Sequence, residues 1–375
     1  MGKPRLPDVE KQELLDLPML LLTLLLTALG LVMIYSSSFA RALYESGDSA
    51  FYFKRQLVFA ALGIGAMLAI SRVRPQLIRK LAFPVLGVSV LFLVLVFVPG
   101  IGRAENGATR WVRLGISFQP SEVAKLGIIL SFAAMISAFG EKMETFRWGI
   151  APFAAILAVI VVLLRLEPHN SAIVIIVCTA GAMLFLGGVK YRWFILGGLA
   201  MLLGLILILG AGGYEASRIT AWQDPFSDPT DDGYQIIQSL YAIGSGGLFG
   251  LGLGNGRQKY LYLPEEHNDY IFSIACEELG LAGAVGILIL YSLLILRGYW
   301  ISMHIRDRFL SLTVAGITTL TALQVFFNIG VVTNLLPSTG ISLPFFSYGG
   351  TALLIQLGEM GIILGASRQC SAGFL

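Results

Sequence analysis

Long runs of apolar residues, separated by short polar segments, recur along almost the whole chain. A membrane-spanning helix needs about 20 consecutive, mostly apolar residues. About ten segments approach this length: residues 18–39, 56–71, 81–98, 121–139, 148–164, 170–188, 193–211, 269–297, 309–334 and 344–366. The pattern therefore predicts an all-α, polytopic integral membrane protein with about ten transmembrane helices.

The composition favours one membrane-embedded domain. The chain has 375 residues, of which 56% are hydrophobic and 13% are charged, whereas soluble domains carry about 25% charged residues. No soluble stretch is long enough for a separate core, so residues 1–375 are interpreted as a single domain. The first apolar run, 18–39, is too long for a cleavable signal peptide and is interpreted as a retained anchor.

The distribution of Lys and Arg predicts the orientation in the membrane. With the N-terminus inside, fifteen of the 26 basic residues lie in inner segments and ten in outer segments. Most of the outer ones belong to two long loops, which weigh little in the positive-inside rule. The tails, residues 1–17 and 367–375, are therefore predicted to be cytoplasmic.

The second of these outer loops, residues 212–268, lies between the seventh and eighth predicted helices. A structureless loop of this length is uncommon in a compact protein. Residues 234–253 are apolar enough to re-enter the membrane or to lie flat on it. Part of the loop is therefore expected to be structured at the outer membrane surface.

Cysteine and histidine usage argues against several kinds of site. The cysteines, Cys178, Cys276 and Cys370, have no CxxC spacing, so neither a disulfide framework nor a zinc site is predicted. The three histidines have no HxxxH spacing, and no protein metal site is predicted.

The net charge of +3 is small, and no nucleic-acid partner is expected. No internal repeat supports an inverted-repeat transporter.

Asp269 is the strongest candidate for chemistry. It stands at the end of the outer loop, before an apolar helix, in a group of polar residues (Glu265, Glu266, His267 and Asn268). A carboxylate among other carboxylates tends to have a raised pKa, which suits a general base. Asp also caps helix N-termini well, and this structural interpretation is about as strong.

Further ionisable residues fall inside predicted helices. Glu277 and Glu278 lie two turns deeper in the helix after Asp269, and Glu359 lies in the last helix. Ionisable groups at membrane depth are costly and often mark functional sites. Pairing with Arg or Lys from another helix is favoured here over direct catalysis.

A second group of charges lies in and after the first outer loop, residues 99–120. Glu122 and Lys125 are spaced i,i+3, so they share a helix face and can pair. Arg110 and Arg113 add positive charge that could bind phosphate. Trp111 could stack on a sugar, although an interfacial aromatic is the commoner case. The glycine-rich run 244–256 could cradle an anion with its amides, but close packing is favoured.

Four long motifs resemble the SEDS family, which comprises the FtsW, RodA and SpoVE proteins. They are NGATRWVRLGISFQPSEVAKL at 106–126, YQIIQSLYAIGSGGLFGLGLG at 234–254, LPEEHNDYIFSIACEELG at 263–280 and LPSTGISLPFFSYGGTALL at 336–354. The second motif resembles the FtsW/SpoVE branch more than RodA. The segment EPHNSAIVI departs from the PDLGTA-like pattern of many relatives, so no role is carried over to His169 or Asn170.

This resemblance implies a peptidoglycan glycosyltransferase that polymerises lipid II at the outer face of the bacterial cytoplasmic membrane. The essential Asp of the family falls on Asp269. The cavity residues of the family match Arg110, Trp111, Glu122 and Lys125. Arg113, His267 and Glu277 complete the candidate substrate-binding residues.

The expected mechanism is inversion, with Asp269 as the base and with Arg110, Arg113 and Lys125 offsetting charge on the leaving pyrophosphate. A divalent cation, Mg or Mn, could assist, although no motif supplies its site. The family implies a class B penicillin-binding protein as partner, together with other membrane proteins of division or elongation, and contact with membrane lipid. The alternatives are a lipid II flippase and a non-catalytic scaffold for division proteins.

Overall fold

The computed structural model describes residues 15–105, 108–198, 214–230 and 233–370. Its helices are α1 (Leu17–Ser46), α2 (Phe51–Ile70), α3 (Pro75–Leu95), α4 (Pro120–Phe139), α5 (Phe146–Gly149), α6 (Ala151–Leu166), α7 (Asn170–Leu186), α9 (Tyr214–Gln223), α10 (Tyr234–Ser245), α11 (Ile271–His304), α12 (Arg308–Val332) and α13 (Gly350–Ser367), with short 3₁₀ helices at Gly140–Glu144 and Pro225–Ser227. Eight of the described helical segments are long and apolar enough to cross a membrane. The predicted polytopic, all-helical membrane protein is confirmed.

The predicted helices match the observed ones with shifted ends. The largest differences are in α1 and α11, which extend seven residues beyond the predicted 18–39 and 269–297. α7 is an apolar helix of 17 residues. Of the predicted helix 193–211, residues 193–198 are helical, and 199–211 lie outside the described residues, as do 1–14 and 371–375.

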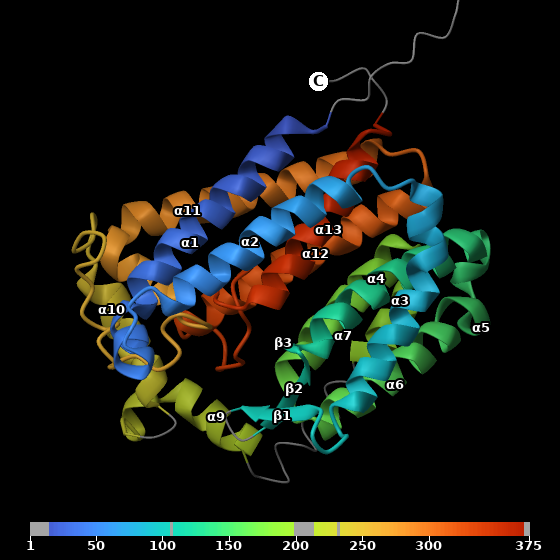
Figure 1. Ribbon diagram of the computed structural model, residues 1–375. Coiled ribbons are helices and arrows are strands. Elements are labelled where there is room, and N and C mark those ends of the chain that lie inside the picture. Colours follow the sequence, from blue (N-terminus) through green and yellow to red (C-terminus); the bar gives the residue numbers. More distant parts are fainter. Residues whose placement is uncertain (1–14, 106–107, 199–213, 231–232, 371–375) are drawn as a thin grey trace, which may run out of the picture.

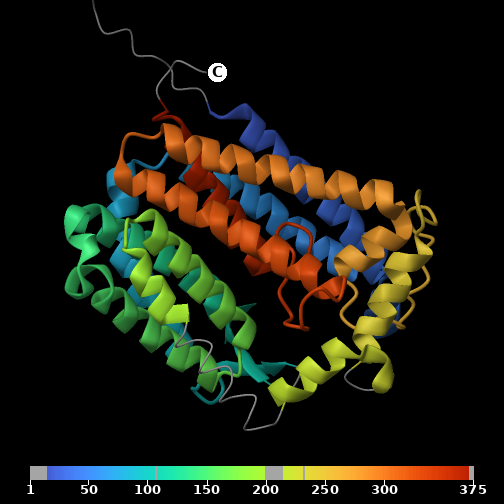
Figure 2. The same ribbon diagram turned by 180° about the vertical axis from the view of Figure 1, so that it is seen from behind.

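The helices form two groups (Figures 1 and 2). One contains α1, α2, α11, α12 and α13, and the other contains α3 to α7. α12 joins them, because it packs on α11 and α13 in its own group and on α4 and α7 in the other. Small residues permit such close approach in membranes: a Cβ on Gly361 of α13 would lie 2.6 Å from the carbonyl oxygen of Met67 in α2.

The first outer loop contains a small antiparallel sheet that the sequence analysis did not predict. Its strands are β1 (Gly102–Glu105), β2 (Ala108–Leu114) and β3 (Ile116–Phe118), with β2 in the centre. Arg103 pairs with Trp111, and Arg113 pairs with Ser117. The sequence does contain a hairpin signal, the dipeptide Asn106–Gly107.

α11 is broken at Gly280, whose φ of 68° and ψ of −169° are not helical. The glycine-rich segment after α10 closes the break. The N–H groups of Leu251 and Gly252 donate to the carbonyls of Glu277 and Glu278, and those of Leu281 and Ala282 donate to the carbonyls of Gly247 and Leu248. The backbone groups freed by the break are thereby satisfied, as a membrane environment requires. The run 244–256 therefore serves close backbone packing, as the sequence favoured.

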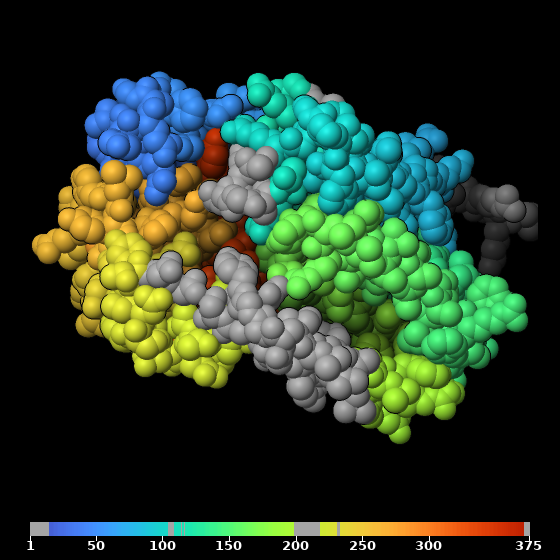
Figure 3. Space-filling model, turned by 90° about the horizontal axis from the view of Figure 1, so that it is seen from below, coloured from blue at the N-terminus to red at the C-terminus, as the bar shows by residue number. Residues whose placement is uncertain are grey.

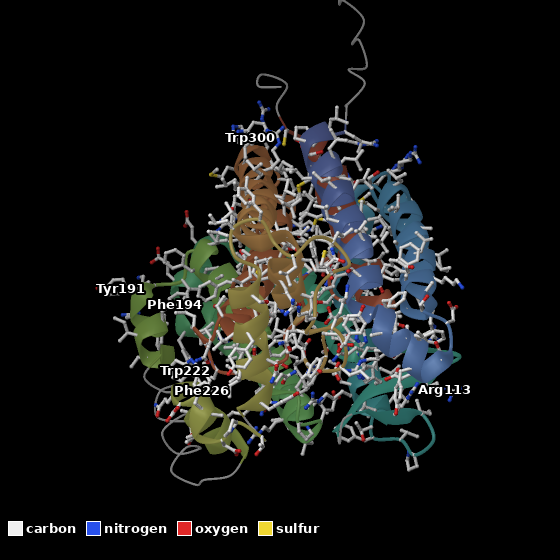
Figure 4. All side chains as sticks on the ribbon, turned by 90° about the vertical axis from the view of Figure 1, so that its left-hand side faces the viewer. Arg113, Tyr191, Phe194, Trp222, Phe226 and Trp300 are labelled. Atoms are coloured by element: carbon white, nitrogen blue, oxygen red, sulfur yellow. The ribbon has the colours of Figure 1, made fainter. Side chains whose placement is uncertain are left out.

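The two ends of the molecule differ. Trp300 of α11 lies at one end, and Arg113, Trp222 and Phe226 lie at the opposite end (Figure 4). This second end carries the sheet, α9 and α10 (Figure 1). Seen from there, the C-terminal part of the chain is visible between the two helix groups (Figure 3). Both long outer loops of the sequence thus lie at one end of the molecule.

Candidate active site

Asp269 lies in the turn that precedes α11. The N-cap of this helix is Tyr270, and it makes no side-chain capping hydrogen bond. The interpretation of Asp269 as a helix cap is therefore wrong. Its side chain is partly buried, at the end of the molecule that carries the sheet and α9.

The main chain of Asp269 is anchored to α12. The side-chain amide of Asn328 donates to the carbonyl oxygen of Asp269 at 2.7 Å and to that of Ile341 at 2.7 Å. Gly340 lies against the carboxylate, since a Cβ there would be 3.1 Å from Oδ2 of Asp269. The loop between α12 and α13 therefore forms one wall beside the acid.

The same loop binds the residues before Asp269. The hydroxyl of Ser347 donates to the carbonyl of Asn268 at 2.8 Å, and the N–H of Tyr348 donates to the carbonyl of His267 at 2.9 Å. Gln56 of α2 in turn donates to the carbonyl of Ser347 at 3.3 Å. Segments that are distant in sequence thus hold the turn in a defined conformation.

The surroundings of Asp269 tune its acidity. Burial is the largest cause of its shift and, together with the negative charge of Glu265, raises its pKa, while His267, Arg218 and Arg110 oppose the rise. The result is a pKa of about 6. A carboxylate with this pKa is largely ionised at neutral pH and still basic enough to accept a proton.

Arg110 reaches this site from β2. Side chains alternate across a strand, so Arg110 lies on the same face as Val112, which is fully buried. Its guanidinium donates to the carbonyl of Pro168 at 2.6 Å. Trp111 and Arg113 belong to the opposite face; Arg113 is exposed (Figure 4) and Trp111 is partly buried. The strand separates residues that the sequence analysis had grouped together, and their predicted roles stay predictions.

Arg218 of α9 is a site residue that the sequence analysis did not single out. Its charge acts on Asp269, and its guanidinium donates to the carbonyl of Ser338 at 2.8 Å. The indole of Trp222, in the same helix, donates to the carbonyl of Asn334 at 3.1 Å. α9 is therefore docked on the loop between α12 and α13. The only sequence signal was a basic residue in a long outer loop.

The predicted pairing of Glu122 and Lys125 is confirmed. The ammonium of Lys125 lies 2.7 Å from Oε1 of Glu122, and both side chains are buried. Glu359 of α13 is also buried and interacts electrostatically with both residues. These charges form a polar cluster between α4 and α13. The substrate-binding role of Glu122 and Lys125 stays a prediction.

His267 is held by aromatic rings and by a carboxylate. The rings of Tyr52 and Tyr348 have centroids 4.5 and 5.6 Å from that of His267. Its Nδ1 lies 3.8 Å from Glu266, whose carboxylate forms a two-pronged ion pair with Arg41 at 2.7 and 2.8 Å. This bonding lowers the pKa of Glu266 against the effect of burial. These contacts fix the position of the His267 ring, two residues before Asp269 in the sequence.

Glu277 is used differently from Asp269. Its carboxylate accepts hydrogen bonds from the N–H groups of Arg257 and Gln258 at 2.8 to 3.3 Å. Within the run 244–256, the N–H groups of Gly254 and Gly256 donate to the carboxylate of Glu278 at 3.0 and 3.4 Å. The anion that these amides bind is therefore a side chain of the protein. Glu278 pairs with Lys259 at 2.6 Å, so its predicted basic partner comes from this loop and not from another helix. A substrate-binding role for Glu277 stays a prediction.

The described residues contain no group of three or more His, Cys, Asp or Glu side chains that could hold a metal ion. Mg²⁺ sites in proteins often use one or two carboxylates together with substrate phosphates. The side chains around Asp269 therefore fit a cation only where the substrate supplies most of its ligands.

Sequence comparisons give consistent relatives. The model of a family described as "Cell cycle protein" (FtsW/RodA/SpoVE) matches residues 16–372. "Stage V sporulation protein E" of Bacillus subtilis is 41% identical over 354 residues, which cover 94% of this chain and 97% of that protein. "Probable peptidoglycan glycosyltransferase FtsW" of Geobacter sulfurreducens (strain DL-1 / KN400) is 40% identical over 363 residues, covering 96% and 97%.

Solved structures share the fold. A chain from "Structural coordination of polymerization and crosslinking by a peptidoglycan synthase complex" superposes with a TM-score of 0.79 at 28% identity, covering 94% of this chain and 98% of that one. The rod shape determining protein RodA of Thermus thermophilus superposes with a TM-score of 0.70 at 29% identity, covering 96% and 98%.

Proposed function

Because the chain belongs to the FtsW/RodA/SpoVE family, we propose that it is a peptidoglycan glycosyltransferase that polymerises lipid II at the outer face of the cytoplasmic membrane. Relatives that carry this activity in their names share about 40% identity over nearly the full length of both chains. The chain is a polytopic membrane protein, as an enzyme acting on a lipid-linked substrate requires.

The observation that carries this proposal is the environment of Asp269. One carboxylate with a pKa of about 6 stands within the electrostatic reach of Arg110 and Arg218, which come from two different outer elements. A base beside two cations suits a reaction in which an alcohol attacks a carbon that bears a pyrophosphate leaving group.

In the proposed mechanism, Asp269 accepts the proton of the 4-hydroxyl of the acceptor GlcNAc. The oxygen forms a bond to the anomeric carbon of the donor MurNAc while the bond from that carbon to the pyrophosphate oxygen breaks. The anomeric centre inverts, and undecaprenyl pyrophosphate leaves. A positioned base of this kind contributes about 10²–10⁴-fold to the rate.

Charge on the leaving pyrophosphate needs compensation. Arg110 and Arg218 lie close enough to Asp269 to influence its charge, and Lys125 belongs to the cluster between α4 and α13. Arginine binds phosphate oxygens in a two-pronged geometry. A divalent cation, Mg or Mn, would arrive with the pyrophosphate and neutralise part of its charge.

The orientation and the partners follow from the same proposal. The end with the sheet and α9 faces the outside, and both termini are cytoplasmic. A class B penicillin-binding protein is the expected partner, because a cross-linking enzyme uses the glycan strand that this reaction makes. Other membrane proteins of division or elongation complete the proposed assembly.

The test is a polymerisation assay with purified protein, lipid II and a divalent cation, with and without a cognate class B penicillin-binding protein. Glycan ladders from the wild type, and none from folded Asp269→Ala, are the expected result. Ladders from both would remove Asp269 as the base. If no pairing gives ladders and liposome assays show lipid II translocation, the protein is a flippase; if both assays are negative, a scaffold is favoured.

A further inference from the structure

A second polar group lies beside Arg110. It is formed by Glu167 and His169, in the connection between α6 and α7, and by Gln119 at the start of α4. Arg110 connects this group to the active site, because its guanidinium donates to the carbonyl of Pro168, the residue between Glu167 and His169. The resemblance to the SEDS family carries no role over to His169 in this segment.

The side chains of this group are buried and incompletely bonded. Glu167 is 1% exposed, and within the described structure neither of its carboxylate oxygens has a hydrogen-bond partner. His169 is 7% exposed; its Nε2 lies 3.3 Å from the amide of Gln119, while its Nδ1 has no partner among the described residues. Buried polar groups are nearly always hydrogen-bonded, so this arrangement indicates a ligand that supplies the missing partners.

Both groups are uncharged at neutral pH. Burial raises the pKa of Glu167 to about 8 against the opposing charge of Arg110, so its carboxyl is mostly protonated. Burial, together with the charges of Arg110 and Lys125, lowers the pKa of His169 to about 3. A neutral carboxylic acid, a neutral imidazole and an amide each offer both donors and acceptors.

We propose that Glu167, His169 and Gln119 form a saccharide subsite that binds hydroxyl or acetamido groups of the lipid-linked sugar, next to Arg110. Neutral donors and acceptors match an uncharged, hydroxyl-rich ring, whereas phosphate is better matched by the arginines. The inference rests on the proposed function for the identity of the substrate.

The test compares two ligands: lipid II, and undecaprenyl pyrophosphate, which lacks the disaccharide and the pentapeptide attached to it. Binding of each to the purified full-length protein is measured in the same detergent. Glu167→Leu is expected to weaken lipid II binding about tenfold, as the loss of one or two hydrogen bonds to a buried partner would. Binding of undecaprenyl pyrophosphate should stay within twofold of the wild type.

Two further variants separate recognition from folding. Glu167→Gln keeps a donor and an acceptor and should retain most of the lipid II affinity. Thr179→Val in α7 is the matched control: Thr179 is 2% exposed, its hydroxyl also has no partner among the described residues, and it lies more than two helical turns beyond His169. This control should leave both affinities unchanged.

The outcomes are distinct. Unchanged lipid II affinity in Glu167→Leu, or an equal loss for both ligands, overturns the saccharide subsite. Where Glu167→Leu does not fold, His169→Leu decides by the same comparison. The wild type could prefer lipid II to undecaprenyl pyrophosphate and yet make no glycan. The proposed function would then be wrong, and the affinities of the Glu167 variants would still test the subsite. If the wild type shows no such preference, the subsite is wrong.

Discussion

Asn328 holds Asp269 by its main chain, across 59 residues of sequence. One side-chain amide donates to the carbonyl of Asp269 and to the carbonyl of Ile341, each at 2.7 Å. Asn328 is 1% exposed, so water does not readily replace these bonds. The position of the proposed base therefore depends on a buried residue near the C-terminal end of α12 that does not itself carry chemistry.

Replacing Asn328 with Leu should lower both activity and stability. Two buried carbonyls would lose their donor, at a cost of about 1–3 kcal/mol for a buried group left unsatisfied. A shift of Asp269 by about 1 Å can cost about 10²-fold in rate. Polymerisation rate and thermal unfolding in detergent measure the two effects. Thr321→Val, on the same helix, replaces a hydroxyl that bonds only within α12 and should change the rate less than twofold.

Asp269→Asn should be inactive but not unstable. The folded pKa of about 6 lies above the ordinary value of about 3.9. The stability associated with protonated Asp269 is therefore present below about pH 4 and is lost as pH rises through about 6. Asn is neutral throughout, so the variant should be at least as stable as the wild type at pH 7.5, by up to about 3 kcal/mol. A thermal unfolding midpoint of Asp269→Asn below that of the wild type at pH 7.5 would contradict this prediction.

The acid limb of the pH–rate profile should report the charge of Arg218. The base must be ionised, so the rate should rise with pH through about 6. Arg218 lowers the pKa of Asp269; Arg218→Gln should therefore move the acid limb to higher pH as well as slowing the reaction. Arg218→Lys keeps the charge and should keep the limb close to that of the wild type. If the acid limb does not move in Arg218→Gln, the charge of Arg218 does not influence the pKa of Asp269.

The buried pair of Lys259 and Glu278 should be important for stability. The two side chains are almost completely buried and lie 2.6 Å apart, and Glu278 also accepts from Ser36 at 2.6 and 2.8 Å. Lys259→Met would leave a buried carboxylate without its counter-ion, at a cost of about 3–5 kcal/mol. Lys259→Met combined with Glu278→Gln should recover part of this loss.

The matched control for this pair is an exposed one of nearly the same length. Lys54 and Asp48 lie 2.7 Å apart with both side chains exposed, and exposed ion pairs add little stability. Lys54→Met should therefore leave the unfolding midpoint nearly unchanged. Equal effects from Lys54→Met and Lys259→Met would show that burial is not the reason for the importance of Lys259.

Gly280→Ala should destabilise the protein, because Gly280 forms the break in α11. Gly280 has a positive φ of 68°, and a Cβ there would lie 2.7 Å from the carbonyl oxygen of Leu248. Backbone strain and overpacking together predict a loss of about 2–5 kcal/mol. Gly286, in the same helix, has open space where its Cβ would be. Gly286→Ala should be neutral or stabilise by about 0.5–1 kcal/mol, and unfolding in detergent compares the two variants.

The helical membrane architecture could be predicted because its physical cause is local. A bilayer demands long apolar runs with internally bonded backbones, and such runs are visible in the sequence. The pairing of Glu122 with Lys125 is local for the same reason, since residues three apart share a helix face. The hairpin in the first outer loop also had a local signal, Asn106–Gly107, which the long apolar pattern around it obscured.

Asp269 was singled out from the sequence by its polar neighbours and by a family motif, but the sequence could not decide between a helix cap and a base. The observed start of α11 at Ile271 excludes the helix cap, whereas the role as base stays a prediction. The charges that face Asp269 also required the fold: Arg218 joins it from a loop helix, whereas strand alternation directs Arg113 away from the face of Arg110.

The sequence by itself determined the membrane-spanning helices, the separation of the polar loops from them and the pairing of Glu122 with Lys125. Only the tertiary structure decided that Glu277 binds the loop backbone, that Gly280 breaks α11 and that Glu167 lies buried beside Arg110. The physical reason is the distance along the sequence over which each kind of interaction acts. Hydropathy and helix-face spacing act over a few residues, whereas the hydrogen bonds and charges of a site join side chains that only packing brings together.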